Sequence, residues 1–212
     1  MNNEVLAPTS HIRLFRPEHV PQPRNLAPFA LPTGPLDVEI GCGVGLHPLN
    51  WARQNPHRTV VALEHTHTRF GAFSQTLALD GTPPNLNAIQ ANAIGWITHA
   101  LPLTPCVDRY FILYPNPNPK SRAGRWALMP FFGRLMTTLK PGGTITMATN
   151  LPWYADEAAE AMALAWGLTV TRRDFTAADS PVGAGRTHFE RKFLEREERC
   201  FEVLGSKSIS SH

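Results

Sequence analysis

A glycine-rich segment between an apolar run and a potential helix constrains the fold of this chain most strongly. Residues 39–46 read Glu-Ile-Gly-Cys-Gly-Val-Gly-Leu and end an apolar stretch that begins at Leu36. Gly41, Gly43 and Gly45 lack a Cβ and adopt positive φ without strain, so the backbone can turn sharply and lie against a ligand. A strand, a glycine turn and a helix in this order predict a cradle for a nucleotide-like cofactor.

The glycine spacing and two carboxylates indicate which cofactor the turn would hold. A dinucleotide fold requires G-x-G-x-x-G, whose third glycine would fall at position 46, which is Leu46. Glu39 stands at the head of the turn, and Glu64 follows a second apolar run nineteen residues beyond Gly45. These acids suit a ligand with a cation and a ribose diol, both of which S-adenosylmethionine has. The alternative is an ordinary tight turn in an α/β sheet.

Length and composition favour one soluble domain in a reducing compartment. The 212 residues are 42% hydrophobic, enough for a core, and contain no apolar stretch that could span a bilayer. The proline-rich, charged start does not resemble a secretory signal, which predicts the cytoplasm. The cysteines Cys42, Cys106 and Cys200 have no metal-like spacing, so we expect free thiols and no metal. A formal charge of +3 favours polyanionic partners.

Short apolar runs alternate with helical stretches, which predicts a mostly parallel sheet covered by helices. We expect strands at residues 36–40, 60–64, 87–91, 109–114 and 144–149, an edge pair at 168–175 and 200–204, and helices at 46–54, 68–79, 127–139 and 154–166. Pro141, Gly142 and Gly143 are expected to stop a helix and turn the chain into the next strand.

The chain divides into three parts. Residues 1–34 mix prolines with basic side chains and predict an extended basic arm or a loosely packed cover over the domain. A disordered tail and an arm that touches RNA are both compatible with this composition. Residues 35–205 form the α/β domain, and residues 206–212 form a polar tail.

Polar residues at the predicted strand ends are the first candidates for a site, because ligands of open α/β sheets lie beyond the carboxyl ends of the strands. Asn92 offers a donor and an acceptor to an adenine edge. Prolines alternate with Asn116 and Asn118, which predicts a stiff turn whose side-chain amides point at a ligand. His65 and His67 have no third ligand at a useful spacing, so a solvated loop is expected there.

Two further segments carry charges and aromatic rings suited to a nucleotide. Lys120, Arg122 and Arg125 suit phosphate, and Trp126 either stacks on a base or packs into the core. Thr187 and Glu190, followed by two cations, could clamp a purine and its phosphates, although a helix cap or an ion pair would explain the same residues.

Together these motifs resemble the bacterial tRNA (guanine-N7)-methyltransferase family over residues 36–204. The turn at 39–45 and the Leu-Lys-Pro-Gly-Gly segment at 139–143 are shared with many methyltransferases, whereas residues 115–120 and 187–190 resemble the more specific Pro-Asp-Pro-Trp-x-Lys and Thr-x-Phe-Glu segments. The resemblance implies a Rossmann-like class I methyltransferase fold with a seven-stranded sheet and an antiparallel edge hairpin, S-adenosyl-L-methionine as cofactor and tRNA as partner. It implies cofactor-binding roles for Glu39, Gly41, Gly43, Gly45, Glu64, Asn92 and Ala93, catalytic roles for Asn116, Lys120, Asn150, Thr187 and Glu190, and substrate-binding roles for Arg122, Arg125 and Lys192.

The chain departs from the family pattern at three carboxylates. Asn92, Asn116 and Asn150 stand where the family has aspartate, and the family's basic run after residue 120 is shortened. An amide keeps the shape of a carboxylate but cannot balance the positive charge that develops on a methylated guanine. Two alternatives therefore remain: a methyltransferase that acts on a small molecule or an amino group, and a non-catalytic RNA-binding subunit.

Overall fold

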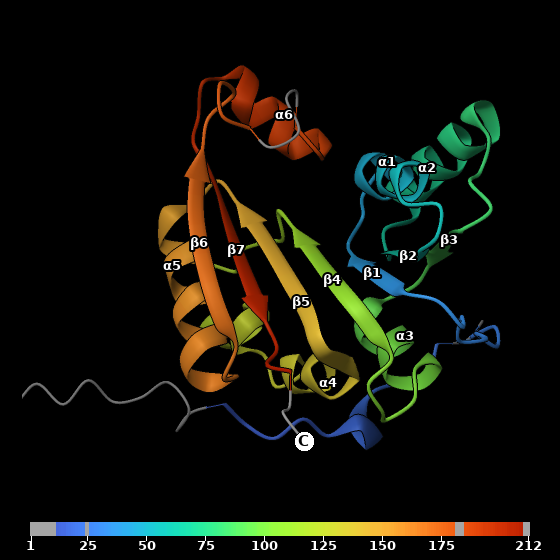
Figure 1. The fold of residues 1–212 in the computed structure, drawn as a ribbon, viewed down its shortest axis with the longest axis horizontal. Coiled ribbons are helices and arrows are strands. Elements are labelled where there is room, and N and C mark those ends of the chain that lie inside the picture. The colour runs from blue at the N-terminus through green and yellow to red at the C-terminus, as the bar shows by residue number, and fades with distance from the viewer. Residues whose placement is uncertain (1–11, 24–25, 181–184, 210–212) are drawn as a thin grey trace, which may run out of the picture.

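Seven strands form one sheet within residues 12–23, 26–180 and 185–209, which are the residues described by the computed structural model (Figure 1). The strands are β1 (Leu36–Ile40), β2 (Thr59–Glu64), β3 (Leu86–Gln90), β4 (Val107–Leu113), β5 (Leu139–Thr149), β6 (Thr169–Phe175) and β7 (Cys200–Ser206). Their order is β3-β2-β1-β4-β5-β7-β6, with β1 to β5 paired in parallel and β7 antiparallel to both β5 and β6. The predicted α/β fold with an antiparallel edge pair is confirmed.

Helices cover both faces of the sheet. They are α1 (Leu46–Gln54), α2 (His67–Asp80), α3 (Ala93–Ala100), α4 (Phe132–Thr138), α5 (Pro152–Glu160) and α6 (His188–Glu195). Successive strand residues point to opposite faces, so Val60 and Ala62 of β2 pack with Phe73 of α2, whereas Val61 and Leu63 join the larger core that includes α3, α4 and α5. Burial on both faces explains why β2 contains a continuous apolar run, whereas in β1 the buried acids Asp37 and Glu39 alternate with apolar residues.

Two helices differ from the prediction at their ends. The helix expected over residues 127–139 begins only at Phe132, after a 3-10 turn at Trp126–Leu128. Pro130 explains the late start, because proline removes a backbone donor and disfavours helical geometry in the residue before it. The helix expected from residue 154 begins at Pro152 and continues through a π-helical turn at Ala161–Ala165. Helices α3 and α6 were not predicted.

The helix predicted to stop before Pro141 does end there, at Thr138, but the predicted turn at residues 141–143 is wrong, because β5 runs through these residues. The register between β4 and β5 shifts between Val107 and Arg109, so the segment forms a bulge in a continuous strand. Gly142 has a φ of 76°, which glycine adopts at low cost. Proline and glycine inside a strand are typical of such bulges.

The described part of the first 34 residues lies against the domain. It contains a 3-10 turn at Pro17–His19. The Phe15 ring lies 5.5 Å from that of Phe131, and the Phe29 ring lies 5.2 Å from that of Trp96. Residues 1–11 and 24–25 of the predicted arm, and residues 210–212 of the predicted tail, lie outside the described residues. The division into arm, domain and tail stays a prediction.

Candidate cofactor and substrate site

A pocket of about 340 Å³ opens at the carboxyl ends of β1, β2 and β4. Its lining includes Glu39, Gly41, Gly43, Glu64, Asn116 and Thr187 from the predicted site, together with Cys42, His47, His65, Arg69, Tyr114, Trp126, His188 and Phe189. The parallel strands place these residues together because their carboxyl ends share one edge of the sheet. Segments more than a hundred residues apart in sequence thus face one cavity.

The glycine turn forms one wall of this pocket. Gly41, Gly43 and Gly45 have φ values of 73°, 60° and 80°. A Cβ at Gly41 or Gly43 would meet no atom within 4 Å, whereas a Cβ at Gly45 would lie 1.9 Å from a Phe73 ring carbon. The first two glycines therefore leave open space for a ligand, and the third allows α2 to pack close to the start of α1.

Glu64 holds the turn in place. It is 2% exposed, its Oε2 accepts a hydrogen bond from the N–H of Gly43 at 3.0 Å, and its Oε1 accepts one from the N–H of Thr66 at 2.7 Å. Burial raises the pKa of Glu64, but the hydrogen bonds from Thr66 and Gly43 outweigh this effect, so the pKa lies below its usual value. Glu64 is thus an ionised acceptor at the pocket wall, and each carboxylate oxygen has a further lone pair for a ligand hydroxyl.

Glu39 forms a buried pair with His47 of α1. The Oε2 of Glu39 lies 2.7 Å from Nδ1 of His47, and both residues line the pocket. The imidazole stacks on Trp51 and meets Phe111 edge to face, which fixes the ring. The histidine therefore orients the carboxylate, a partner that the sequence analysis did not identify.

The segment after β4 makes a tight polar turn at the pocket rim. Tyr114 and Asn118 have positive φ values of 52° and 44°. The side-chain oxygen of the exposed Asn116 accepts a hydrogen bond from the N–H of Asn118 at 3.0 Å. The Asn118 side chain instead donates to the carbonyl of Gly124 at 2.7 Å. The prediction that the Asn118 amide points at a ligand is therefore wrong, whereas Asn116 does line the pocket.

Thr187 and Glu190 act at the start of α6. The Thr187 hydroxyl caps the helix by accepting from the N–H of Glu190 at 3.0 Å. Glu190 is fully buried, pairs with Arg186 at 2.8 Å and accepts from the Tyr114 hydroxyl at 2.9 Å. Of the alternatives left open for these residues, the structure shows the cap and the ion pair. Thr187 still lines the pocket, whereas Glu190 anchors α6 to the end of β4.

This network fixes the protonation of its members. Burial raises the pKa of Glu190, but hydrogen bonds and the charge from Arg186 lower it further, so the carboxylate is ionised. The pKa of Tyr114 lies well above its usual value, mainly because the residue is buried and also because the charge of Glu190 is near. The phenol therefore remains a hydrogen-bond donor and ties the rim of the pocket to α6.

Several predicted site residues lie outside the pocket. Asn92 caps α3 by accepting from the N–H of Ile94 at 2.9 Å, and it borders a hollow against residues 19–23. Arg125 forms two hydrogen bonds of 2.9 Å with Glu157, which also accepts from Arg122 at 3.0 Å. The predicted residues that do not line the pocket are Gly45, Asn92, Ala93, Lys120, Arg122, Arg125, Asn150, Glu190 and Lys192.

The pocket mouth contains a pair that the sequence analysis missed. Phe189 of α6 is 40% exposed, and the Arg69 guanidinium of α2 lies 5.7 Å from its ring centroid. Phe189 belongs to the segment 187–190, but no sequence pattern links it to Arg69, 120 residues earlier. The pair brings an aromatic ring and a cation to the opening.

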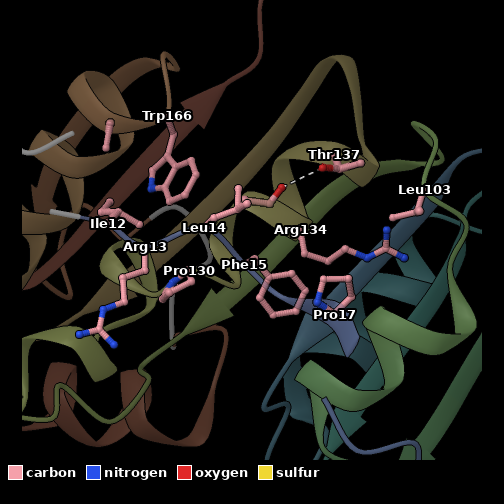
Figure 2. A pocket seen from close by; sticks show the side chains of 12 residues that line it. Ile12, Arg13, Leu14, Phe15, Pro17, Leu103, Pro130, Arg134, Thr137 and Trp166 are labelled. Carbon is pink, nitrogen blue, oxygen red and sulfur yellow. Dashed lines mark hydrogen bonds between the residues drawn. The ribbon is translucent and has the colours of Figure 1, made fainter. Parts of the chain in front are cut away.

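A larger cavity, of about 520 Å³, lies elsewhere (Figure 2). Ile12, Phe15, Pro130 and Trp166 provide much of its apolar lining. Arg134 at its end is buried and donates to the Leu101 carbonyl at 2.7 Å, which helps end α3. Since none of the predicted site residues lines this cavity, chemistry rather than size identifies the glycine-turn pocket as the site.

Within the described residues, no helix could span a membrane, and no cluster of three or more His, Cys, Asp or Glu could hold a metal.

Comparisons with known proteins agree with the fold. The methyltransferase family model Methyltransf_4 matches residues 33–203. The tRNA (guanine-N(7)-)-methyltransferases of Nitrosospira multiformis and Nitrosomonas eutropha are each 30% identical over 178 residues, covering 82% and 83% of this chain and 76% and 78% of those proteins. The crystal structure of the 16S rRNA methyltransferase KamB has a TM-score of 0.62 at 25% identity and covers 82% of this chain and 88% of that one.

The pocket also fits S-adenosylmethionine. The space above Gly41 and Gly43 admits a ligand against the backbone, and the volume lies in the range of roughly 300–1,000 Å³ common for such pockets. The carboxylates of Glu39 and Glu64 suit the cationic and hydroxyl groups of that ligand. The chain belongs to the tRNA (guanine-N(7)-)-methyltransferase family and is a methyltransferase that uses S-adenosylmethionine.

Proposed function

We propose that this chain transfers a methyl group from S-adenosylmethionine to N7 of a guanine in tRNA. The names of its relatives support the acceptor. One structural observation carries the proposal: the glycine turn, Asn116 and the first residues of α6 face the same pocket. A cofactor on the turn and a base at the rim would therefore share one cavity.

The residues of the chain need to orient the acceptor rather than remove a proton. The cofactor supplies a methyl group on a cationic sulfur, and guanine N7 already carries a free lone pair. The hydrogen bond from Asn118 fixes the Asn116 amide and leaves the oxygen a second lone pair for a donor on the base. Phe189 and Arg69 offer a ring and a cation at the opening. Because Asn116 is neutral, we expect slower transfer than with a carboxylate at this position.

Exposed cations near the rim are suited to the phosphates of tRNA. Lys120 and Lys192 are exposed, and the Arg122 side chain is 62% exposed. Arg125 is only 14% exposed and paired with Glu157, so we assign it a positioning role.

The free thiols of Cys42 and Cys106 suit a reducing compartment, and we propose the cytoplasm as the location.

The acceptor atom can be tested with two forms of one tRNA transcript. One contains guanosine, and the other contains 7-deazaguanosine throughout, which replaces N7 by carbon and keeps the other functional groups. We expect tritiated methyl transfer from S-adenosylmethionine only to the first transcript, with 7-methylguanosine in its nucleoside mass spectrum. Equal labelling of both transcripts would exclude N7.

A second acceptor class is favoured by one residue. Asn116 followed by a proline at the end of β4 is similar to the amide that accepts hydrogen bonds from a target amino group in amino methyltransferases. Labelling of the 7-deazaguanosine transcript would support a nucleobase amino group. Labelling of a metabolite extract but neither transcript, with no change in rate as salt rises, would support a small molecule, because phosphate contacts impose a steep salt dependence.

A further inference from the structure

An exposed tryptophan lies near the candidate site, at the same end of the sheet. Trp153 is the second residue of α5 and follows the end of β5 by four residues, so it stands near the carboxyl edge of the strands. Its relative exposure is 40%, whereas the next residue, Tyr154, is 1% exposed. Single exposed apolar side chains are common on protein surfaces, so the neighbours of this ring decide whether it has a role.

The ring of Trp153 is in contact with a cation that is itself held in place. The Arg125 guanidinium lies 4.8 Å from the centroid of Trp153. Both of its bonds to Glu157 measure 2.9 Å, and it is 14% exposed, so the guanidinium cannot turn freely. The Tyr154 ring also lies 5.5 Å from that of Trp153, at a tilt of 33°. The indole is therefore held by two protein groups, while the Trp153 residue remains 40% exposed.

Two guanidinium groups near the ring share a single carboxylate. Glu157 is shared by Arg122 and Arg125, so one carboxylate faces two guanidinium groups. Lys120 on the same loop is exposed. The loop connects to the pocket through Trp126, which lines the pocket and whose backbone N–H donates to the Tyr154 hydroxyl at 3.3 Å. Exposed aromatic surface next to cations is the combination that binds unpaired nucleotides.

We propose that Trp153 is a stacking platform for an unpaired base of the RNA substrate, with Arg122 and Lys120 on neighbouring phosphates. The inference rests on the proposed function, since it needs an RNA acceptor at this edge. It adds a contact outside the cofactor pocket. Stacking on a supported ring tolerates any base, so the platform contributes affinity for the RNA rather than choice of the methylated atom.

The test compares W153A and W153F with the wild type and with L79A, which truncates another exposed apolar side chain, in α2. We measure the Kd for unmodified tRNA, the Kd for S-adenosylmethionine and methyl transfer at limiting and saturating tRNA. Loss of one stacked base corresponds to a roughly 5- to 150-fold weaker Kd for tRNA in W153A. W153F should keep part of the affinity, and L79A all of it.

Two readouts separate stacking from a structural role. Cofactor affinity should be unchanged in W153A, and tRNA should quench less of the intrinsic tryptophan fluorescence in W153F than in the wild type. Wild-type tRNA affinity in W153A, or an equal loss of cofactor affinity, would overturn the platform. If wild-type protein binds tRNA but does not methylate it, the proposed function fails, and the binding comparison still decides the role of Trp153.

Discussion

Alanine at two neighbouring glycines should separate folding from cofactor binding. Gly43 and Gly45 both have positive φ, which costs a residue with a Cβ roughly 1–2 kcal/mol. At Gly43 no further cost follows, because the added Cβ would meet no atom within 4 Å. At Gly45 the Cβ would overlap the ring of Phe73, which is fully buried between α1, α2 and β2.

The overlap sets the expected difference. Overpacking a core typically adds about 1–3 kcal/mol, so we expect a loss of roughly 2–5 kcal/mol in the free energy of unfolding for G45A and about 1–2 kcal/mol for G43A. Cofactor affinity should fall more in G43A than in G45A, because the methyl group of G43A points into the space that the ligand needs. Urea unfolding gives the first quantity, and calorimetric titration with S-adenosylmethionine gives the second.

Two results would refute this reasoning. If G43A binds S-adenosylmethionine as tightly as the wild type, the open space above Gly43 is not the cofactor site. If G43A and G45A lose equal stability, the contact of Gly45 with Phe73 does not decide the cost.

Three further outcomes follow from the same site. E64Q should weaken S-adenosylmethionine binding roughly 10- to 150-fold, because an amide has only one oxygen and cannot accept from both Gly43 and Thr66. The matched exposed variant E160Q should not weaken it, and equal affinities of E64Q and the wild type in calorimetry would contradict the reasoning. E190Q should lower the free energy of unfolding at pH 7 by roughly 3–5 kcal/mol, because it removes the charged partner of buried Arg186. Since the folded pKa of Glu190 lies below the usual 4.5, its stabilisation is present above pH 4.5 and is lost as pH falls through the folded pKa, so urea unfolding of the two proteins should converge in acid. Methyl transfer to tRNA should fall steeply between 50 and 200 mM salt, and a flat profile would argue against phosphate contacts.

The strands could be predicted because parallel strands buried on both faces appear as short apolar runs. β1 and α1 have the predicted bounds, since a glycine turn marks the boundary between them. The order of the strands was not predicted, because β7 reaches its place between β5 and β6 through pairing that no local pattern encodes.

The two unpredicted helices share a cause. Asn92 and Thr187 begin α3 and α6 with the same side-chain oxygens that would otherwise bind a ligand. In α3 three consecutive residues, Gly95 to Ile97, are buried, so the helix lacks the polar face that makes an amphipathic helix recognisable. A polar residue after a strand therefore predicts either a helix cap or a ligand contact, and only the position of its oxygen decides between them.

Charge in the sequence likewise overstates the charge available to a substrate. Arg125 was grouped with Lys120 and Arg122 by proximity, yet its partner Glu157 lies 32 residues later, on α5. Within the described residues, no ion pair joins Lys120 or Lys192 to an acid. Since a paired and buried guanidinium contributes little field at the surface, the phosphate-binding capacity of the rim depends on where distant carboxylates fold against it. The same pairing that removes Arg125 from the surface fixes it beneath Trp153, so a predicted phosphate ligand becomes the support of a ring.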